Sequence, residues 1–362
     1  MRADALSSWL HELTDWQVDV RCPLEQSHGV YRFGVELYNQ LQRRAPVLHH
    51  AYFNFLELAG LHRHERAILG AEKFRGVLQS FRPDLIVSTH AHLNHGFFEI
   101  SRRCLAPHRV RCVIYCGELG GGYGFSRHWV NPRADLFIAA VPETRAAAIQ
   151  HGMPPARARV GGFLLRTSFY DEPSPDRVRA FVEQELKLDS NEPILLLATG
   201  ARGANNHYRL LRSLERRGKP AQVVALCGGN SGVIQQLRAW GSNVSGVELR
   251  ALAYREDMPL LLRAATAVVA RPGTGTSSEA IQTGCPLLMN GLGGVMPQER
   301  ITVRYVLEHG LGRLIRRPAD LAELLDDWER SPADYTTLRA SIQAARPSID
   351  PRTIVGHLAE QV

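Results

Sequence analysis

Short apolar runs rich in β-branched residues constrain the fold of this chain more than any other feature. They occupy residues 84–89, 111–116, 135–140, 193–200, 222–229, 244–249, 266–273 and 286–290. Turn residues bound the runs, and the spacing between successive runs leaves room for helices. Strands that are apolar throughout are buried on both faces, as in parallel sheets with helices between the strands. The pattern therefore predicts an α/β protein with parallel sheets.

The alternation breaks in the polar and proline-bearing stretch 166–180. We interpret this stretch as a linker between an N-terminal domain, residues 1–165, and a C-terminal domain, residues 181–345. Residues 346–362 are expected to form a C-terminal helix that packs back on the N-terminal domain. The 362-residue length suits two domains of ordinary size. The predicted fold is a pair of Rossmann-like, doubly wound domains that face a cleft.

The chain carries a formal net charge of +7, which favours anionic partners such as nucleotide phosphates or lipid headgroups. Its arginines are scattered and it has no aromatic RNA-binding motif, so nucleic acid is not an expected partner. No apolar run reaches the roughly 18 residues that span a bilayer, and the N-terminus lacks the apolar core of a signal peptide. We expect a cytoplasmic protein that its basic surface can bring to the inner face of a membrane.

The six cysteines form no C-x-x-C pair. Cys227 and Cys285 lie in or beside strand-like runs, and we interpret the cysteines as buried, reduced thiols. Cys112 and Cys116 lie near His128, but their spacing fits no zinc pattern. We therefore expect no metal site.

Three turns of the second half follow strands directly, at the carboxyl edge where open α/β sheets bind ligands. In the first, "TGARG", Gly200 can bring a bare amide to an anion and Arg202 supplies charge for a diphosphate. A plain turn with a solvated arginine explains this motif equally well. In the second, "CGGN", Gly228 allows a tight strand exit and Asn230 can donate to a base or phosphate, although this is also ordinary turn chemistry.

The third turn opens the stretch "RPGTGTSSEAIQTG", residues 271–284. It combines close backbone approach with hydroxyl donors, through Gly273, Thr274, Gly275 and Thr276. The helix that starts here offers unpaired amides to a diphosphate. A carboxylate would repel a phosphate, so we expect Glu279 to accept hydrogen bonds from the vicinal diol of a ribose. The alternative is that Glu279 only complements the helix dipole from the first turn.

One loop after the strand at 286–290, the segment "MPQERITV" brings Gln298 and Glu299 to the same rim. A Gln-Glu pair both donates and accepts hydrogen bonds, which suits a ligand rich in hydroxyl groups. Taken alone, such a pair at the start of a helix is also an ordinary surface feature.

In this order, the motifs "TGARG", "CGGN", "GTGTSSEA" and "PQERIT" resemble the nucleotide-sugar half of GT-B glycosyltransferases. They are similar to the group that contains the monogalactosyldiacylglycerol synthases and the bacterial lipid II N-acetylglucosaminyl transferase, and the resemblance covers most of residues 193–317. It implies that Glu279 binds the ribose diol, that residues 273–276 lie against the diphosphate, and that Gln298 and Glu299 hold sugar hydroxyls. Thr302 replaces the asparagine usual in the last motif, which leaves the sugar open.

Two further positions refine what the resemblance implies. Many retaining GT-B enzymes carry a glutamate eight residues before the ribose glutamate, and Arg271 stands there in this chain, which favours an inverting reaction. The stretches "STHAHLNHGFFEISRR" and "IYCGELGGGYGFSRHW" resemble the acceptor side of the same enzymes more loosely. Glu118 then takes the place of an aspartate, and His128 and Trp129 match a histidine and a tryptophan.

An inverting transfer needs a base near the acceptor hydroxyl. Glu118 is the leading candidate, with His90, His95 and His128 as alternatives. Each of these histidines can equally be a core or surface residue with a satisfied ring. Relatives begin with a strand and a "GGGHxxxA" loop, whereas this chain opens with "MRADALSSWL". We therefore expect the first strand and the glycine loop to be missing.

The resemblance implies an inverting, metal-independent transfer of a hexose or N-acetylhexosamine from a UDP-sugar to a hydroxyl acceptor. The acceptor can be lipid-linked, and no cofactor besides the donor is expected. Two alternatives remain open. One is a nucleotide-sugar 2-epimerase, although its "TERPE" run is absent from residues 287–300. The other is a non-catalytic partner that binds a nucleotide sugar or an acceptor.

Overall fold

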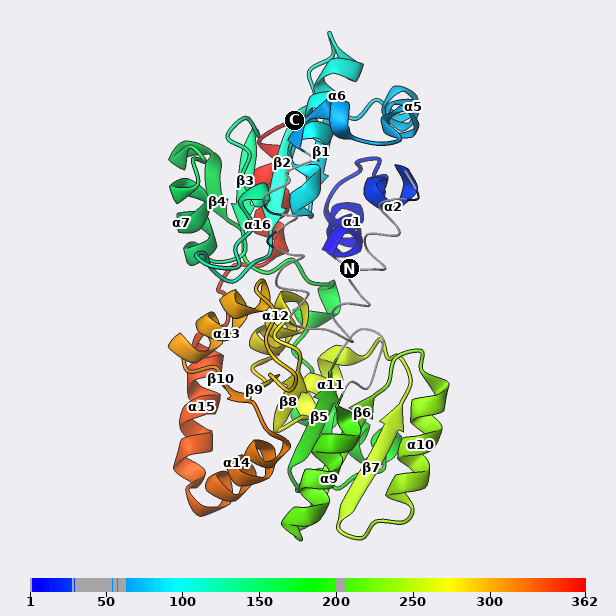
Figure 1. Cartoon of the computed structure of the whole chain (residues 1–362), viewed down its shortest axis with the longest axis vertical. Helices are drawn as coiled ribbons and strands as arrows, with labels where there is room; N and C mark the ends of the chain where they lie inside the picture. The colour runs from blue at the N-terminus through cyan, green and yellow to red at the C-terminus, as the bar shows by residue number, and fades with distance from the viewer. Residues whose placement is uncertain (1, 28, 30–53, 55–56, 58–62, 200–205) are drawn as a thin grey trace. The chain divides into compact units, whose positions relative to one another are not determined.

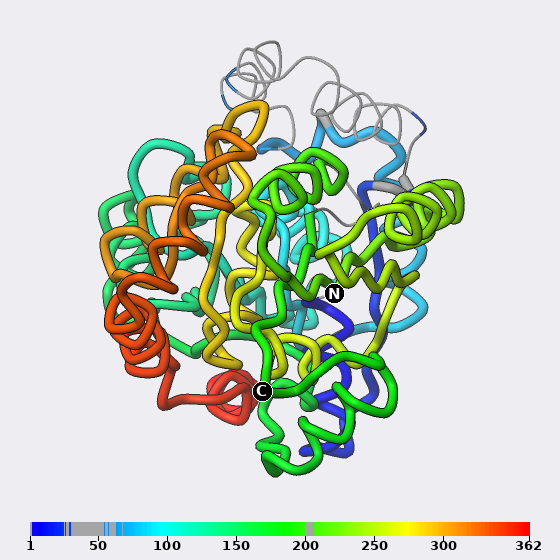
Figure 2. Tube along the Cα trace, turned by 90° about the horizontal axis from the view of Figure 1, so that it is seen from below, coloured from blue at the N-terminus to red at the C-terminus, as the bar shows by residue number. Residues whose placement is uncertain are grey.

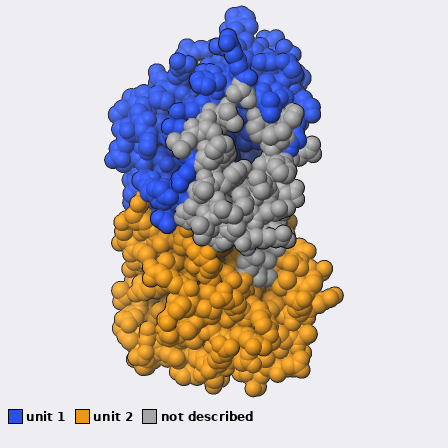
Figure 3. All heavy atoms as spheres, viewed as in Figure 1, with its two compact units in different colours: residues 1–167, 296–301, 347–362 blue, residues 168–295, 302–346 orange. Residues whose placement is uncertain are grey.

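The structure is a computed structural model, and it describes residues 2–27, 29, 54, 57, 63–199 and 206–362. The chain divides into two compact units (Figure 3). Unit 1 comprises Met1–Thr167, Met296–Ile301 and Pro347–Val362, and unit 2 comprises Ser168–Val295 and Thr302–Arg346. The first change of unit falls inside the stretch 166–180.

Unit 1 is built on a sheet whose described strands are all parallel, in the order β1-β2-β3-β4 (Figure 1). The strands are β1 (Leu85–Ser88), β2 (Arg111–Cys116), β3 (Leu136–Ala139) and β4 (Ala158–Val160). The helices in this part of the chain are α2 (Pro23–Ser27), α5 (Ala71–Phe81), α6 (Gly96–Leu105) and α7 (Pro142–Gln150). Because β2 and β3 are buried on both faces, they contain almost only apolar residues.

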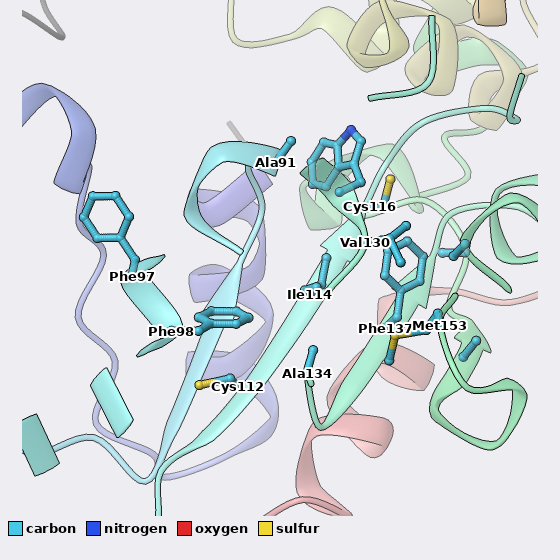
Figure 4. Close-up of a cluster of buried hydrophobic side chains, with 14 of the residues drawn as sticks. Ala91, Phe97, Phe98, Cys112, Ile114, Cys116, Val130, Ala134, Phe137 and Met153 are labelled. Atoms are coloured by element: carbon cyan, nitrogen blue, oxygen red, sulfur yellow. The ribbon is translucent and has the colours of Figure 1, made fainter. Parts of the chain in front are cut away.

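The core of unit 1 lies between this sheet and α6. Phe98 of α6, Ile114 of β2 and Phe137 of β3 belong to one cluster of buried side chains (Figure 4). Cys112 and Cys116 alternate with Ile114 along β2 and complete the cluster from the same strand. Alternate residues of a strand share a face, which explains why these three side chains pack together.

The first and last helices of the chain pack together in unit 1. Trp9 of α1 (Arg2–Leu13) is 1% exposed, and its indole N–H donates to the carbonyl oxygen of Leu165 at 2.8 Å. The C-terminal helix α16 (Pro351–Ala359) packs on α1 and brings Ile354 against Gly161, where a Cβ atom would lie 2.8 Å from the isoleucine side chain. Burial of one apolar face of α16 therefore holds residues 347–362 in unit 1.

Unit 2 contains a parallel sheet in the order β10-β9-β8-β5-β6-β7. Its strands are β5 (Ile194–Ala198), β6 (Ala221–Leu226), β7 (Val247–Leu252), β8 (Ala267–Ala270), β9 (Leu287–Asn290) and β10 (Gly312–Ile315). The strand order reverses between β5 and β8, so the crevice outside their carboxyl ends is the expected ligand position of a doubly wound sheet.

Helices connect the strands of unit 2, and the trace in Figure 2 follows this alternation. The connecting helices are α9 (His207–Arg217), α10 (Ser231–Gly241), α11 (Met258–Ala264), α12 (Thr274–Thr283) and α13 (Glu299–Glu308). The helix α8 (Pro175–Ala180) precedes the first strand, and α14 (Pro318–Arg330) and α15 (Pro332–Ala344) follow the last one. Among the helices of the described ranges, none is long and apolar enough to cross a membrane.

All the strands predicted from apolar runs are present, with bounds that differ by a few residues. The sequence pattern did not predict β4 and β10, which lie at the edges of the two sheets. Both edge strands carry an exposed arginine, Arg159 in β4 and Arg313 in β10, because one side of an edge strand meets solvent. The edge strands β1 and β7 do follow apolar runs, so the edge strands that escaped prediction are those with no such run.

Candidate functional site

The start of α12 is an open helix N-terminus at the carboxyl end of β8. Gly273 is the N-cap residue, its backbone is extended, and no side chain caps the helix there. A Cβ atom at Gly273 would find no atom of a described residue, other than its chain neighbours, within 4 Å. The first amides of a helix lack intrahelical partners and carry the positive end of the helix dipole. This position can therefore bind a phosphate group closely.

Glu279 is the sixth residue of α12 and lies in its second turn. The alternative that this carboxylate complements the helix dipole from the first turn is therefore wrong, since the dipole effect falls off within that turn. Gly275 and Thr276 precede Glu279 by four and three residues, so the three share one face of the helix. Helical side chains lean toward the N-terminus. The half-buried Glu279 side chain thus lies one turn below the open end of α12.

Three elements of unit 2, α12, β9 and α13, each carry a buried polar atom without a described partner. Ser277 of α12, Asn290 at the end of β9 and Thr302 of α13 are buried, and Ser277 Oγ, Asn290 Nδ2 and Thr302 Oγ1 have no hydrogen-bond partner among the described residues. The sequence did not single out Asn290, because an asparagine at a strand end is common. Leaving such groups unpaired costs about 1–3 kcal/mol each, so water or a ligand is expected to satisfy them.

Of the other two glycine turns, the structure describes only the second, "CGGN", in full. Gly200 and Arg202 lie outside the described residues. Gly228 has a φ of 57°, in the left-handed region that favours glycine, and it ends β6 in a tight turn. Asn230 caps α10, because its side-chain oxygen accepts from the backbone N–H of Val233 at 3.2 Å. Its amide nitrogen is the group that a ligand could use.

His207, which the sequence did not single out, ties together the carboxyl ends of β5 and β6. Its Nε2 lies 2.9 Å from the carbonyl oxygen of Leu226, and its Nδ1 lies 2.9 Å from the Thr199 hydroxyl. A carbonyl oxygen only accepts, so Nε2 carries the hydrogen and Nδ1 accepts from Thr199. Burial lowers the pKa of His207 to about 4. The neutral His207 ring therefore links the ends of β5 and β6. A single histidine in the sequence gives no sign of such a structural role.

Gln298 and Glu299 follow β9 by one loop, as the sequence indicated, and α13 begins at Glu299. Their segment, Met296–Ile301, groups with unit 1, because it packs on the loop after β2. A Cβ atom at Gly124 would overlap the Pro297 carbonyl oxygen, and Arg300 lies 5.2 Å from the centre of the Tyr123 ring. The Glu299 side chain is buried, and its carboxylate accepts from the Met296 backbone N–H at 3.0 Å. Glu299 thus helps to start α13, and sugar binding by the pair stays a prediction.

Glu118 follows β2 closely, and residues from distant parts of the chain surround it. Arg2 donates to the carbonyl oxygen of Gly117 at 2.8 Å, and the Thr144 hydroxyl donates to that of Glu118 at 2.6 Å. Burial raises the pKa of the Glu118 carboxyl, while the charge of Arg2 and a hydrogen bond from Trp129 act in the opposite direction. A carboxylate with a raised pKa can take up a proton during a reaction.

Histidine rings form a cluster at the carboxyl ends of β1 and β2. The ring centroids are 5.3 Å apart for His90 and His92, 5.6 Å for His92 and His128, and 6.4 Å for His95 and His128. The structure therefore brings together all three histidines that the sequence proposed. It adds His92, whose place on a short helical turn, η3 (Ala91–Leu93), gave no signal in the sequence.

Burial leaves the rings of His92 and His95 uncharged near neutral pH. It lowers the pKa of His92 to about 3 and that of His95 to about 4, and the charges of neighbouring basic groups reinforce both shifts. The pKa of His128 is also lowered, mainly by burial, although the Glu57 carboxylate opposes this shift from 3.9 Å away. A neutral imidazole can accept one hydrogen bond and donate another. The cluster therefore suits a hydroxyl group or a proton transfer better than an anion.

Hydrogen bonds between the loop after β1 and the loop after β2 hold the histidine cluster in place. The Asn94 side chain donates to the carbonyl oxygen of Trp129 at 3.0 Å, and the Asn131 side chain donates to that of Asn94. Both asparagines are buried. Among the residues the structure describes, no group of three or more His, Cys, Asp or Glu is arranged to hold a metal ion. Cys112, Cys116, Cys227 and Cys285 are buried and free, as interpreted, but Cys22 is exposed, so the interpretation is wrong for that residue.

No family model matches the chain. The chain is 24% identical over 281 residues to a probable chloroplastic monogalactosyldiacylglycerol synthase of Nicotiana tabacum, which covers 75% of this chain and 50% of the relative. It is 23% identical over 293 residues to the processive diacylglycerol beta-glucosyltransferase of Bacillus pumilus, covering 81% and 73%. The chain spans about half the length of the curated plant relatives that it matches.

Solved structures resemble the chain at low sequence identity. MurG of Acinetobacter baumannii has a TM-score of 0.56 and 14% identity, and the match covers 80% of this chain and 76% of that one. The UDP-GlcNAc 2-epimerase of Neisseria meningitidis, bound to UDP-GlcNAc, has a TM-score of 0.57 and 12% identity over 80% of both chains. HepE of Anabaena, in complex with UDP, has a TM-score of 0.51 and 20% identity, covering 79% and 80%. These likenesses confirm the GT-B fold and the predicted resemblance.

Proposed function

We propose that this chain is a glycosyltransferase that moves a sugar from a UDP-sugar to the hydroxyl group of a lipid acceptor. Its relatives include a monogalactosyldiacylglycerol synthase and a diacylglycerol glucosyltransferase, which supports a lipid acceptor. HepE was solved with UDP and with UDP-glucose, which supports a uridine nucleotide as the donor. The protein then works at a membrane surface, although none of its described helices can span the bilayer.

The observation that carries the donor half of the proposal is the open start of α12. The amides after Gly273 and the positive end of the helix dipole bind the diphosphate. Glu279, one turn further along, accepts hydrogen bonds from the ribose diol. The unpaired Ser277, Asn290 and Thr302 groups offer further hydrogen bonds to the bound nucleotide sugar.

The acceptor is proposed to bind at the carboxyl edge of the unit 1 sheet. The acceptor oxygen attacks the anomeric carbon, its proton passes to Glu118, and the bond from that carbon to the diphosphate breaks with both electrons leaving on UDP. Attack opposite to the leaving UDP inverts the configuration of this carbon, in keeping with Arg271 at the position of the retaining-enzyme glutamate. The neutral histidine cluster orients the acceptor hydroxyl. Backbone amides stabilise the leaving diphosphate without a metal ion.

A nucleotide-sugar 2-epimerase remains the second candidate, because the Neisseria epimerase has the same fold at a TM-score of 0.57. That likeness concerns the fold alone, whereas the similar sequences are those of lipid glycosyltransferases. The presence of proton-transfer groups at the edge of the unit 1 sheet does not separate the two reactions, since both move protons. Dependence on an acceptor does separate them.

The test uses the full chain with UDP-glucose, UDP-galactose or UDP-GlcNAc, and phosphatidylcholine vesicles with or without diacylglycerol. Release of UDP that depends on diacylglycerol, together with a glycosylated lipid found by mass spectrometry, is the expected result. A change of sugar configuration at C2 without any acceptor would establish the epimerase instead. Tight donor binding with no turnover on any hydroxyl acceptor would favour the non-catalytic partner.

A further inference from the structure

A basic groove runs along the outer surface of unit 2 between α9 and α14, which pack side by side (Figure 1). It has a volume of about 620 Å³. Its lining residues from α9 are Tyr208, Arg209, Arg212, Ser213, Arg216 and Arg217. The α14 side contributes Arg317, Pro318, Ala319, Ala322, Glu323 and Asp326. The arginines outnumber the acids of the lining by five to two.

Three of these arginines form an exposed stripe on α9. Arg209, Arg212 and Arg216 follow one another at intervals of three and four residues, so they lie on one face of the helix. The opposite face buries Leu210, Leu211 and Leu214 in the core of unit 2, which accounts for the fold of the helix without the arginines. Like charges at this spacing oppose helix stability. The stripe therefore has no evident structural purpose.

The acids of α14 are engaged by other basic residues. Arg217 and Lys219 share Asp326, with distances of 3.0 and 2.6 Å, and also share Glu329. Arg317 pairs with Asp320 at 2.7 Å and with Glu323 at 3.3 Å.

The arginine stripe, in contrast, has no acidic partner within the described ranges. Arg212 makes a different contact, because its guanidinium lies 5.1 Å from the centre of the Tyr208 ring. No described acid neutralises the stripe, so its positive charge can attract an anionic ligand.

Tyr208 adds an aromatic group at the end of the groove where α9 begins. Its side chain is 46% exposed and packs edge-on against Trp240, with ring centroids 6.2 Å apart. The adjoining α14 also begins at this end, at Arg317 and Pro318. The start of α14 is already capped, because the Asp320 carboxylate accepts from the backbone N–H groups of Arg316 and Arg317 at 2.8 and 2.9 Å. The exposed aromatic ring and the guanidinium groups of the stripe favour phosphate groups next to an apolar phase.

We propose that this groove docks unit 2 onto a membrane surface by binding the phosphate groups of anionic lipids. From Arg209 to Arg216 the charges extend over about 10 Å of helix, which suits several neighbouring headgroups better than one soluble phosphate. This inference rests on the proposed function in one respect, namely that the acceptor is a membrane lipid. It adds a surface that starts at the carboxyl edge of the sheet, where α9 and α14 begin, and extends away from that edge along the two helices.

The experiment measures co-sedimentation of the full chain with vesicles of phosphatidylcholine, with and without about one third phosphatidylglycerol. The test variant carries Arg209→Gln, Arg212→Gln and Arg216→Gln. The matched control carries Arg157→Gln, Arg159→Gln and Arg177→Gln, which removes the same charge at other exposed positions. We expect the wild type and the control to bind anionic vesicles alike, and the test variant to bind roughly 100-fold more weakly, at about fivefold for each arginine.

Equal loss in both triple variants would overturn the proposal, because net charge alone would then explain binding. Unchanged binding of the test variant would overturn it too, as would RNA or inorganic pyrophosphate binding that needs the stripe while vesicles do not bind. UDP affinity of the test variant, expected to be unchanged, shows that unit 2 is folded. Vesicle binding is measured without donor, so docking can be established even if no sugar is transferred, and can fail even if transfer occurs.

Discussion

The two sheets of this protein have the same parallel architecture, yet their carboxyl edges carry opposite kinds of chemistry. The edge of the unit 1 sheet carries titratable side chains, Glu118 and the histidine cluster, in a buried setting. The edge of the unit 2 sheet at β8 carries glycines, hydroxyl groups and a helix start. The first edge is suited to moving a proton and the second to holding an anion. The two sheets have the same architecture, so the difference in chemistry between their carboxyl edges comes from the connecting loops.

Loop length is the physical origin of the contrast. In unit 1 the chain runs from Cys116 to Leu136 between β2 and β3, which leaves enough residues to bury side chains against one another. In unit 2 only three residues separate Ala270 of β8 from Thr274 of α12. So short a turn exposes backbone amides rather than side chains. If proton transfer belongs to the unit 1 edge and anion binding to the unit 2 edge, substitutions at the two edges should affect different quantities.

The largest effect is expected for Glu118→Gln, which keeps the size of the side chain and removes its basicity. If Glu118 takes the acceptor proton, turnover should fall by about 10²- to 10⁴-fold, while UDP affinity should not change. Initial rates of UDP release and calorimetric titration of UDP measure the two quantities. Glu12→Gln, at an exposed position of α1, is the control. An unaltered rate would remove Glu118 from the mechanism and direct attention to the histidine cluster.

Acid is expected to destabilise the folded protein, because several of its buried histidines are uncharged. The folded-state pKa values of His92, His95 and His207 lie at about 3, 4 and 4, below the ordinary value of 6.5. Between pH 6.5 and 4 the unfolded chain therefore binds more protons, so the free energy of unfolding should fall as the pH falls through this range. For the fully buried His207 the loss amounts to roughly 3 kcal/mol.

Hydrogen exchange measured at pH 7 and pH 5, read separately for peptides of each unit, checks this prediction. Unit 1 should lose more protection than unit 2, because more of its histidines have a lowered pKa. His207→Asn should flatten the pH dependence of unit 2 alone. Equal protection at both pH values in both units would contradict the assignment of neutral, buried rings.

An intermediate effect is expected for Glu279→Ala. Losing hydrogen bonds to a charged acceptor costs about 1.5–3 kcal/mol, so UDP should bind about 10- to 100-fold more weakly. Glu248→Ala, on the partly exposed face of β7, is the control. Wild-type protein should also lose affinity for 2′-deoxy-UDP, whereas the Glu279 variant should bind UDP and 2′-deoxy-UDP alike. Unchanged UDP affinity in a folded variant would refute the ribose role.

The smallest effects compare two glycines, one in each unit. No described residue other than its chain neighbours lies within 4 Å of a Cβ atom at Gly273, so Gly273→Ala should leave the melting temperature unchanged and weaken UDP binding several-fold by blocking close approach. Gly124 has a φ of 97° and faces the Pro297 carbonyl oxygen, so Gly124→Ala should destabilise unit 1 by about 1–3 kcal/mol. Differential scanning fluorimetry and UDP titration separate the two outcomes. A loss of stability at Gly273 would show that this glycine serves packing instead.

The sequence by itself determined the strands that carry apolar runs and the α12 turn, whereas the structure placed Glu279 in the second turn of its helix. The strands and the turn are local properties, since burial on both faces leaves an apolar run and a helix start leaves glycine and hydroxyl residues. The tertiary structure decided which loops meet. It brought Arg2 to Gly117 across 115 residues of sequence, gathered four histidines into one cluster, and packed Met296–Ile301 on unit 1. Such meetings depend on packing between distant segments, which no local pattern of residues records.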